Sequence, residues 1–305
     1  MAYPTGHLPD HPAVIAARAG LHLHPEYGAM RVGTMPLKTT NRAKLATSQG
    51  GPGILDQHDT SSCEGHAHAS GITLSFANAG TPLPEVVSPV GLYLGALMVD
   101  AVPNRDGTLP PLVDQGTMPS SILGGLLLYG GVGASVWGQY PASSATMYLP
   151  GTTTSQLIQP SPTQLFGERA FRLNGAYFLT TSGASLVRDV YRVHASGRVL
   201  TNAIPASGAD FQGYGGGVLG ALSGDVDHAQ LFADSEWTGT QAQLDAFMAG
   251  DDSLLSLYLG HGVNSWGATW GEVDALNGLG GQYRADANYV QQAQDWCVLS
   301  LARVS

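Results

Sequence analysis

Glycine and proline interrupt this chain so often that they limit which elements it can form. The 305 residues include 41 glycines and 18 prolines. Glycine favours turns and helix ends, and proline cannot donate a backbone hydrogen bond inside a helix. We therefore expect short helices and many turns rather than long helices.

The first half of the chain is typical of helices. Residues 64–80 lack strong helix formers, yet they predict a modest helix that Gly80 and Pro82 would end. In residues 114–133, apolar side chains recur at helical spacing after Pro119, and glycines close the segment. Residues 1–50 show no clear periodicity, and we interpret them as an N-terminal arm.

The pattern changes near residue 150. Residues 170–181 alternate between apolar and polar like a strand, and residues 184–197 resemble an amphipathic helix capped by a glycine. Residues 198–206 and 294–305 again predict strands. The sequence therefore predicts an α+β protein with a helical half, about 51–150, and a β-rich half, about 151–305.

Composition excludes some classes of protein. Hydrophobic residues make up 43% and charged residues 12%, which is enough apolar material for a substantial core. The formal net charge is −10 with only 13 basic residues and no basic cluster, so we expect no nucleic-acid partner. No apolar run is long enough to cross a bilayer, so we expect no membrane partner.

The two cysteines, Cys63 and Cys297, are too few for a disulfide framework. The first twenty residues lack the charged and apolar regions of a secretory signal. We therefore expect a reducing setting, either the cytoplasm or a particle assembled there, in which a free thiol survives. Cys297 lies in an alternating segment and is expected in the core.

The first cysteine stands in the stretch DQHDTSSCEGHAHASG, residues 56–71. It can be a zinc ligand, a buried thiol or a nucleophile. His58, Cys63, His66 and His68 match none of the usual spacings of zinc ligands, so we expect no metal and no organic cofactor. His66 and His68 are then expected on the helix surface or partly buried.

A cysteine nucleophile needs help from other residues. Its thiol must ionise, which a helix N-terminus and a neighbouring imidazolium favour. The developing oxyanion needs donors, and the side chain of Gln57 is a candidate. The base must come from elsewhere in the chain and be oriented by a third group.

Two downstream segments contain suitable residues. His228 begins an alternating run, and Asn264 is followed two residues later by Trp266. An asparagine can accept a hydrogen bond from imidazole, and a tryptophan can shield that bond from water. His261 is a rival base, but on an extended strand it lies about 10 Å from Asn264 and on the opposite face.

These segments together resemble the papain-like cysteine peptidases. The shared features are Gln57 six residues before Cys63, the sequence DHA around His228, and NSWGATWGE from Asn264 onward. Residues 114–141 and 186–205 resemble other segments of that family in the same order. The resemblance covers residues 50–305 in fragments and is closest to a bacterial or phage-type member without disulfides or a long pro-segment.

The resemblance implies a role for each matching residue. Cys63 would be the nucleophile, His228 the base and acid, and Asn264 the residue that orients His228. Gln57 would donate to the oxyanion beside the Cys63 amide. In the substrate-binding region, Gly116 would lie along the substrate backbone and Trp266 would shield the Asn–His bond; a simple turn is the equal alternative for Gly116. Residues 51–305 would form the catalytic domain, with the site in the cleft between its halves.

The chain departs from the family at two places. Glu64 stands after the nucleophile where tryptophan is usual, and its carboxylate opposes thiolate formation unless the side chain turns away. The 36 positions from His228 to Asn264 exceed the usual spacing, which predicts an insertion, a short helix near residues 238–252.

The expected activity is hydrolysis of peptide bonds in a protein or peptide substrate through a Cys63 thioester. Two alternatives remain. The same fold can act as an amidase on cell-wall peptide, or as a structural component of an assembly such as a virion, with a site that is idle or used once. In the second case the N-terminal arm would contact an assembly partner.

Overall fold

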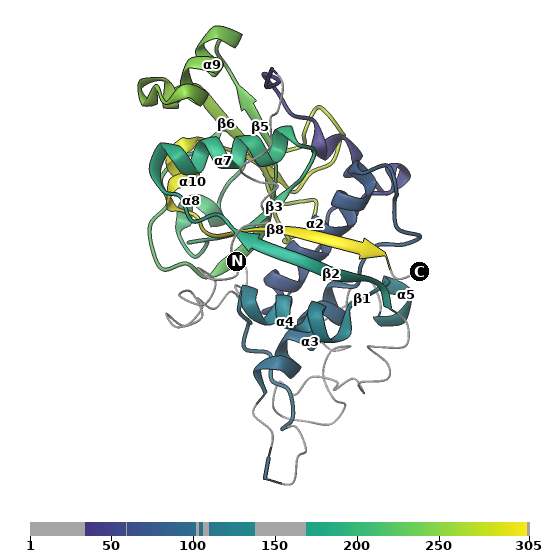
Figure 1. Cartoon of the computed structure of the whole chain (residues 1–305). Coiled ribbons are helices and arrows are strands. Elements are labelled where there is room, and N and C mark those ends of the chain that lie inside the picture. The colour runs from purple at the N-terminus through teal and green to yellow at the C-terminus, as the bar shows by residue number, and fades with distance from the viewer. Residues whose placement is uncertain (1–33, 59, 102–103, 106–109, 138–168, 304–305) are drawn as a thin grey trace.

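The computed structural model describes residues 34–58, 60–101, 104–105, 110–137 and 169–303. Within these residues the first half is mainly helical and the second half holds most of the strands together with further helices, which confirms the α+β fold class. In Figure 1, helices α3 and α4 lie below the long strands β2 and β8, and α7 and α10 lie above them.

The three longest helices in the described part of the first half lie close together in sequence. They are α2 (Cys63–Asn78), α3 (Pro89–Asp100) and α4 (Pro119–Tyr129). Proline stands at the first position of both α3 and α4, where no intrahelical N–H is needed. The hydroxyl of Ser88 accepts the Gly91 amide and caps α3. The helix predicted after Pro119 is confirmed.

Helix α2 is the central helix of the molecule. Of its 16 residues, 14 are buried, so it has no solvent face. It packs against α3 on one side and against β3 and β5 on the other. At Gly65 an added Cβ would lie 2.4 Å from the Pro89 carbonyl oxygen, so only glycine permits this approach of α3.

The described strands form one eight-stranded sheet in the order β1-β2-β8-β3-β5-β6-β7-β4. All neighbours are antiparallel except β4 and β7, which are parallel. The strands are β1 (Gly131–Val132), β2 (Arg169–Phe178), β3 (Leu200–Ile204), β4 (Val218–Leu219), β5 (His228–Trp237), β6 (Tyr258–Val263), β7 (Gln282–Ala285) and β8 (Gln294–Arg303).

Further helices pack around this sheet or connect its strands. They are η1 (Asn41–Lys44), η2 (Thr47–Gln49), α5 (Ala134–Trp137), α7 (Gly183–Ala195), α8 (Ala209–Gln212), α9 (Gln241–Ala249), η4 (Asp252–Leu257) and α10 (Ala287–Gln292). Helix α9 confirms the short helix predicted near residues 238–252, and its being an insertion stays a prediction. A capping box of Thr240 and Gln243 begins it, and Gly250 ends it.

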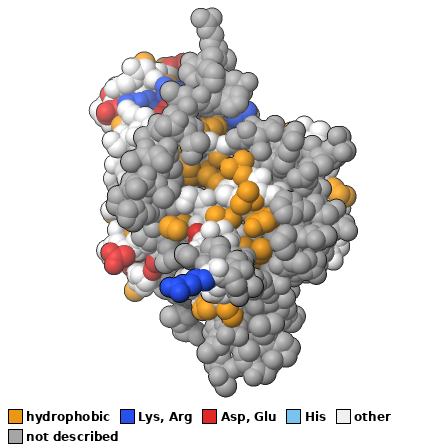
Figure 2. Space-filling model, turned by 60° about the horizontal axis from the view of Figure 1, so that its bottom comes forward, with side chains coloured by type: hydrophobic (Ala, Val, Ile, Leu, Met, Phe, Trp, Pro, Cys, Tyr) orange, Lys and Arg blue, Asp and Glu red, His pale blue; other side chains and the backbone are white. Residues whose placement is uncertain are grey.

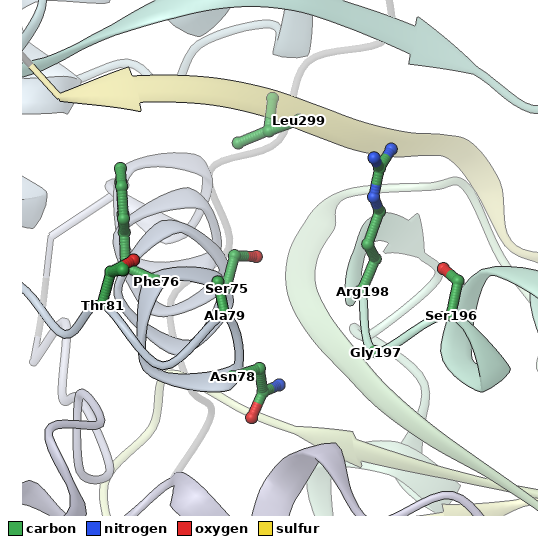
Figure 3. A pocket seen from close by; sticks show the side chains of 9 residues that line it. All are labelled: Ser75, Phe76, Asn78, Ala79, Thr81, Ser196, Gly197, Arg198 and Leu299. Carbon is green, nitrogen blue, oxygen red and sulfur yellow. The ribbon is translucent and has the colours of Figure 1, made fainter. Parts of the chain in front are cut away.

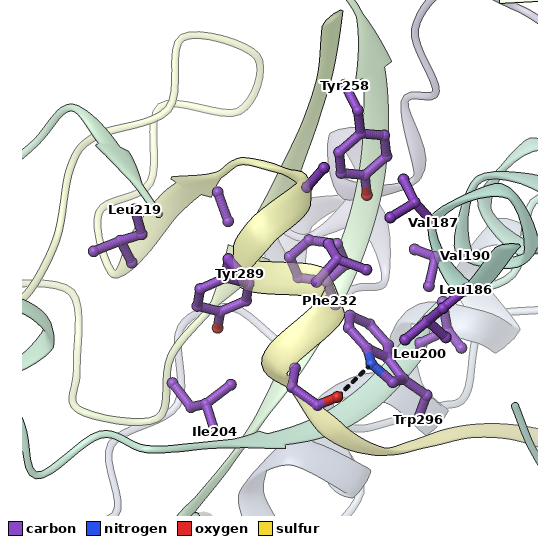
Figure 4. Close-up of a cluster of buried hydrophobic side chains, with 14 of the residues drawn as sticks. Leu186, Val187, Val190, Leu200, Ile204, Leu219, Phe232, Tyr258, Tyr289 and Trp296 are labelled. Atoms are coloured by element: carbon purple, nitrogen blue, oxygen red, sulfur yellow. Dashed lines mark hydrogen bonds between the residues drawn. The ribbon is translucent and has the colours of Figure 1, made fainter. Parts of the chain in front are cut away.

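The main hydrophobic core fills the β-rich half. Figure 4 shows side chains from α7, β3, β5, α10 and β8 packed together. The ring centroids of Phe232 and Trp296 lie 5.1 Å apart. The indole N–H of Trp296 donates to the Ala293 carbonyl, so this buried polar atom is paired. A second core joins α2, α3 and α4 to β8 and includes Cys297, which is buried as expected.

Exposed apolar residues also occur in the helical half. Figure 2, which turns the bottom of the molecule forward, shows hydrophobic side chains gathered on that face. On α4, Leu127 and Leu128 are 65% and 54% exposed. In the described part of the chain, no helix combines the length and apolarity needed to span a membrane.

Residues 34–50 pack onto the β-rich half. The backbone amide of Thr39 donates to the Ser235 carbonyl, and the amide of Trp237 donates to the Leu37 carbonyl. These bonds pair residues 37–39 with the part of β5 that lies beyond its pairing with β3. The side-chain amide of Asn41 reaches three carbonyl oxygens, and the buried Arg42 pairs with Asp234 at 2.8 Å. The boundary predicted near residue 50 stays a prediction.

Candidate active site

Cys63 lies at the first position of α2 and is completely buried. Its side chain forms a small cluster with Ala67, one turn along the helix, and Ala229 of β5. Ala229 directly follows His228, so the helix N-terminus and the start of β5 meet at this cysteine. The unpaired amides of a helix N-terminus carry a partial positive charge, which favours a thiolate at this position.

His228 and Asn264 form a hydrogen bond of 2.7 Å between Nε2 and Oδ1. The backbone amide of Ser265 also donates to the same Oδ1, at 2.7 Å. Because a backbone N–H can only donate, this atom must be the amide oxygen of Asn264, and Nε2 of His228 must carry the proton. The basic nitrogen of the neutral imidazole is therefore Nδ1.

Two aromatic rings cover the imidazole. Trp266 lies against His228 with the ring centroids 4.6 Å apart and the planes tilted by 37°. Phe211 of α8 packs on Trp266 at 5.4 Å and on His228 at 6.3 Å. Trp266 is 3% exposed, so water has little access to the His228–Asn264 bond from that side.

Gln57 is held by the motif that contains Asn264. Its backbone amide donates to the Ser265 carbonyl at 2.7 Å, and Asp56 forms a β-bridge with Trp266. The Ser265 hydroxyl donates to Gln57 Oε1 at 2.6 Å, while Gln57 Nε2 donates to the Thr60 carbonyl at 2.8 Å. These bonds fix the orientation of the side-chain amide, with its donor end toward the loop that leads to Cys63.

A buried chain of hydroxyls supports that loop. Thr60 donates to the Gln57 carbonyl at 2.7 Å, and its oxygen lies 2.6 Å from the Ser62 hydroxyl. Ser62 in turn contacts Nδ1 of His66 at 3.1 Å. Burial lowers the pKa of His66 to about 4, so this imidazole is neutral at physiological pH. The sequence motifs gave no signal for Thr60 or His66 in this role.

Gly116 is connected to the loop before Cys63 by hydrogen bonds through Tyr93 and Asp114. Its φ of +82° requires glycine, and its amide donates to the Tyr93 hydroxyl at 3.1 Å. Tyr93 donates to Asp114 at 2.7 Å, and Asp114 also accepts the amide of Ser61. Tyr93 and Asp114 thus join the Gly116 turn to the loop before Cys63, which the sequence analysis did not foresee. Burial and the Asp114 carboxylate raise the pKa of Tyr93 far above its usual value.

The histidines of α2 are more buried than expected. We predicted His66 and His68 on the helix surface or partly buried, but they are 0% and 1% exposed. That prediction is wrong because α2 has no solvent face. Each Nδ1 contacts the carbonyl oxygen four residues earlier, Ser62 and Glu64 respectively, at 2.9 Å.

The rival base is engaged elsewhere. His261 contacts the Glu236 carboxylate at 3.1 Å, and burial lowers its pKa to about 4. Among the residues that the structure describes, no three His, Cys, Asp or Glu side chains gather in a way that could hold a metal ion.

A pocket of about 360 Å³ lies away from this site. Figure 3 shows it between the end of α2, near Asn78, and the turn that contains Arg198, with Leu299 above. Cys63 begins α2 and Asn78 ends it, so the helix places the two about 22 Å apart. This pocket therefore does not belong to the Cys63 site.

Comparisons with known proteins support this architecture. Xylellain, a cysteine protease from Xylella fastidiosa, matches with a TM-score of 0.57 and 16% identity, over 98% of this chain and 97% of that chain. Bromelain from Ananas comosus matches at 0.55 and 15%, over 88% and 99%. A digestive procathepsin L2 from Tenebrio molitor larval midgut matches at 0.58 and 17%, over 92% and 72%.

At this level of identity the matches establish the fold, and the chain has the papain-like fold that the motifs predicted. No protein-family model matches the sequence, and no curated protein matches it.

Proposed function

We propose that this papain-like fold carries a cysteine peptidase that hydrolyses peptide bonds through a thioester at Cys63. The observation that carries the proposal is the His228–Asn264 bond of 2.7 Å, placed where β5 meets the N-terminus of the Cys63 helix. This bond requires the proton of the neutral imidazole to sit on Nε2, so Nδ1 is the nitrogen that can act as the base. A helix N-terminus, a base and a residue that orients the base are what a thiol nucleophile requires.

In the first step the Cys63 thiolate attacks the peptide carbonyl carbon and forms a C–S bond. The carbonyl electrons move to oxygen, where the Cys63 amide and the Gln57 side chain donate hydrogen bonds to the resulting oxyanion. His228, protonated by the thiol, then gives that proton to the leaving nitrogen as the C–N bond breaks. In the second step His228 removes a proton from water, and the resulting hydroxide attacks the thioester carbon. The C–S bond then breaks, which releases the carboxylic acid and restores the Cys63 thiolate beside the protonated His228.

The roles of the remaining residues follow from their contacts. Asn264 and Trp266 hold the imidazole in one orientation. Gly116 lies along the substrate backbone in the proposed complex, and since its N–H already donates to Tyr93, its carbonyl is the group that binds a peptide N–H.

Access to the site is limited in this structure. Cys63, His228 and Gln57 are all 0% exposed. A substrate reaches the sulfur only after neighbouring chain moves. An assembly component whose site is idle or used once is the alternative that the following experiment separates from an active peptidase.

Labelling with an electrophilic, substrate-mimicking thiol probe tests the proposal. We expect labelling at Cys63 in the folded protein and a loss of about 100-fold or more in rate for His228→Ala. His261→Ala is the matched control, because it removes another buried imidazole of the same sheet, and Cys297→Ala removes the second thiol. Both should keep the labelling. Absence of labelling in folded wild-type protein would favour the idle assembly component.

A further inference from the structure

The pocket at the far end of α2 contains a cation that pairs with no acidic side chain among the described residues. Arg198 lines this pocket and is partly buried, and none of the other described residues that line it is charged. Other arginines in the described part of the chain do pair with a carboxylate: Arg42, Arg188, Arg192 and Arg284. Water screens a guanidinium less in a partly enclosed pocket than on an open surface, so an anion bound there gains more from it.

A second donor and two apolar side chains border the same pocket. The amide Nδ2 of Asn78, at the end of α2, is buried and has no hydrogen-bond partner in the described structure. A buried donor without a partner costs free energy, which an acceptor on a ligand would relieve. Phe76 and Leu299 provide the apolar surface. Figure 3 shows Phe76 and Arg198 on facing walls, with Leu299 on β8 and Asn78 between the walls at the bottom of the view.

The short helix η1 holds both walls of the pocket in place. Lys44 Nζ donates to the Ala77 carbonyl at 2.9 Å, at the end of α2. The side-chain amide of Asn41 donates to the Arg198 carbonyl at 3.2 Å and to the His194 carbonyl at 3.1 Å. Because one element binds both walls, the pocket is formed before a ligand arrives, and binding does not have to order it.

The size and the charge of the pocket select a class of ligand. Its volume of about 360 Å³ lies near the lower end of the range of about 300–1,000 Å³ that is typical of ligand pockets, so the ligand is small. One cation lines the described part of the pocket, which matches a single negative charge better than a phosphate dianion. The planar fork of an arginine can bind both oxygens of a carboxylate. The formal net charge of −10 also disfavours multiply charged anions.

We propose that this pocket binds a small organic acid. The carboxylate pairs with Arg198 and accepts a hydrogen bond from Asn78, and the apolar body of the acid lies against Phe76 and Leu299. Because α2 separates the pocket from Cys63 by about 22 Å, the inference goes beyond the proposed peptidase function and does not depend on it.

The probes for this site are hexanoate, its neutral amide hexanamide, and acetate. Saturation-transfer NMR titrations of the whole chain measure their binding. We expect hexanoate to bind with a dissociation constant of about 1 mM or lower. Hexanamide has the same shape without the charge, and should bind at least about tenfold more weakly. Acetate keeps the charge but lacks the apolar body, and should also bind at least about tenfold more weakly.

The variant Arg198→Gln identifies the cation. We expect it to bind hexanoate at least about tenfold more weakly and to bind hexanamide as the wild type does. Arg284→Gln is the matched control, because it removes an arginine that pairs with Glu272 on β7, three strands from β3 in the sheet, and hexanoate binding should not change. If Arg198→Gln does not fold, Arg198→Lys keeps the charge without the fork and should bind hexanoate several-fold more weakly.

Three results would overturn the proposal. They are no binding of hexanoate to the wild type at about 10 mM, equal affinity for hexanoate and hexanamide, and unchanged hexanoate binding in Arg198→Gln or, where only that variant folds, in Arg198→Lys. The two proposals also fail separately, because Cys63→Ala cannot be labelled at this position yet should bind hexanoate like the wild type. Absent labelling of Cys63 would contradict the peptidase function alone, and absent hexanoate binding would contradict the acid site alone.

Discussion

A single backbone amide determines the protonation of the proposed base. Ser265 N–H donates to Asn264 Oδ1, which fixes the orientation of the amide and thereby the proton on His228 Nε2. The same serine uses its hydroxyl to hold Gln57. Ser265 therefore positions two groups of the site without contacting the reacting atoms itself.

Tyr93 is the residue whose removal should separate binding from chemistry. Tyr93→Phe removes the hydroxyl that holds both Gly116 and Asp114. We expect KM for a peptide substrate to rise several-fold while kcat changes less, because the hydroxyl bonds the Gly116 turn directly and the loop before Cys63 only through Asp114. Steady-state kinetics measures this.

Tyr191→Phe is the control for Tyr93→Phe. It also removes one buried phenolic hydroxyl, which donates to the Pro36 carbonyl at 2.7 Å, but on α7. Both variants should lose about 1 kcal/mol of stability, and only Tyr93→Phe should change KM. A drop in kcat with unchanged KM would contradict the assignment of Gly116 to substrate binding.

Which site residues could be predicted depended on whether they belong to a recognisable motif. Cys63, Gln57, His228 and Asn264 stand in short motifs, and the structure brings them to one region. Tyr93, Asp114 and Thr60 act through contacts between segments far apart in sequence or through carbonyl oxygens, and no local pattern reveals such contacts. The sequence showed that the Glu64 carboxylate opposes thiolate formation, but it did not predict the contact between Glu64 and His68.

At the level of elements, the sequence patterns of the second half predicted several of its strands and helices, but gave no indication of α8, α10 or β7. Gly197 has a φ of +80° just after α7, and Gln294–Arg303 forms β8, both as the sequence indicated. The burial of α2 could not be predicted in the same way. A helix that is buried on every side has no apolar stripe, so periodicity gives no information about its surroundings.

The contact between α2 and α3 should be sensitive to one methyl group. In Gly65→Ala the new Cβ would lie 2.4 Å from the Pro89 carbonyl oxygen and 3.0 Å from the Tyr93 Cβ, so the helices must separate. We expect a loss of about 2 kcal/mol in the free energy of unfolding, measured by denaturant titration. Because the shift occurs two residues from Cys63, labelling of Cys63 should also slow.

Gly80→Ala is the comparison for this prediction. Gly80 follows α2 with a φ of +73°, and an added Cβ there meets nothing within 4 Å. Its cost comes from backbone strain alone, about 1 kcal/mol, and Cys63 labelling should be unaffected. Equal labelling rates in both variants would mean that the α2–α3 distance does not control the nucleophile.

At the level of the whole molecule, buried ionisable groups fasten residues 34–50 to the sheet. Arg42 pairs with Asp234 and Asp274, and Asp234 also accepts the hydroxyl of Thr39 and the amide of Asn41. Burying such a network costs desolvation energy, but removing one partner strongly destabilises the folded protein. His194 and His261 are two further buried titratable groups of this region.

These buried histidines predict sensitivity to acid. Burial lowers the pKa values of His66, His194 and His261 from 6.5 to about 4. Between these two values the unfolded chain binds protons that the folded protein does not, so the free energy of unfolding falls as the pH decreases. At about pH 5 the loss is on the order of 1–2 kcal/mol per histidine, with little change above about pH 7.5.

Thermal unfolding across this pH range measures the effect. His58→Gln is the control. Because His58 is exposed, this variant should lose as much stability as the wild type when the pH decreases. A second loss of stability is expected only at lower pH. Desolvation raises the pKa values of Glu236 and Asp274, but the nearby Lys38, His261 and Arg42 outweigh it and lower them. These carboxylates therefore stop stabilising the fold only when they become protonated at low pH. A melting temperature that stays constant from about pH 7.5 to about pH 4.5 would contradict this account.

The bond between Gln57 and Ser265 spans 208 positions of the chain. A ribosome releases the amino-terminal part of a protein first, so the helix with Cys63 emerges long before the segment that orients its base. A nascent or prematurely terminated chain thus displays a sulfhydryl with no orienting asparagine and no anchored glutamine. Whatever reaction this thiol performs, translation must have passed Ser265 before it can begin.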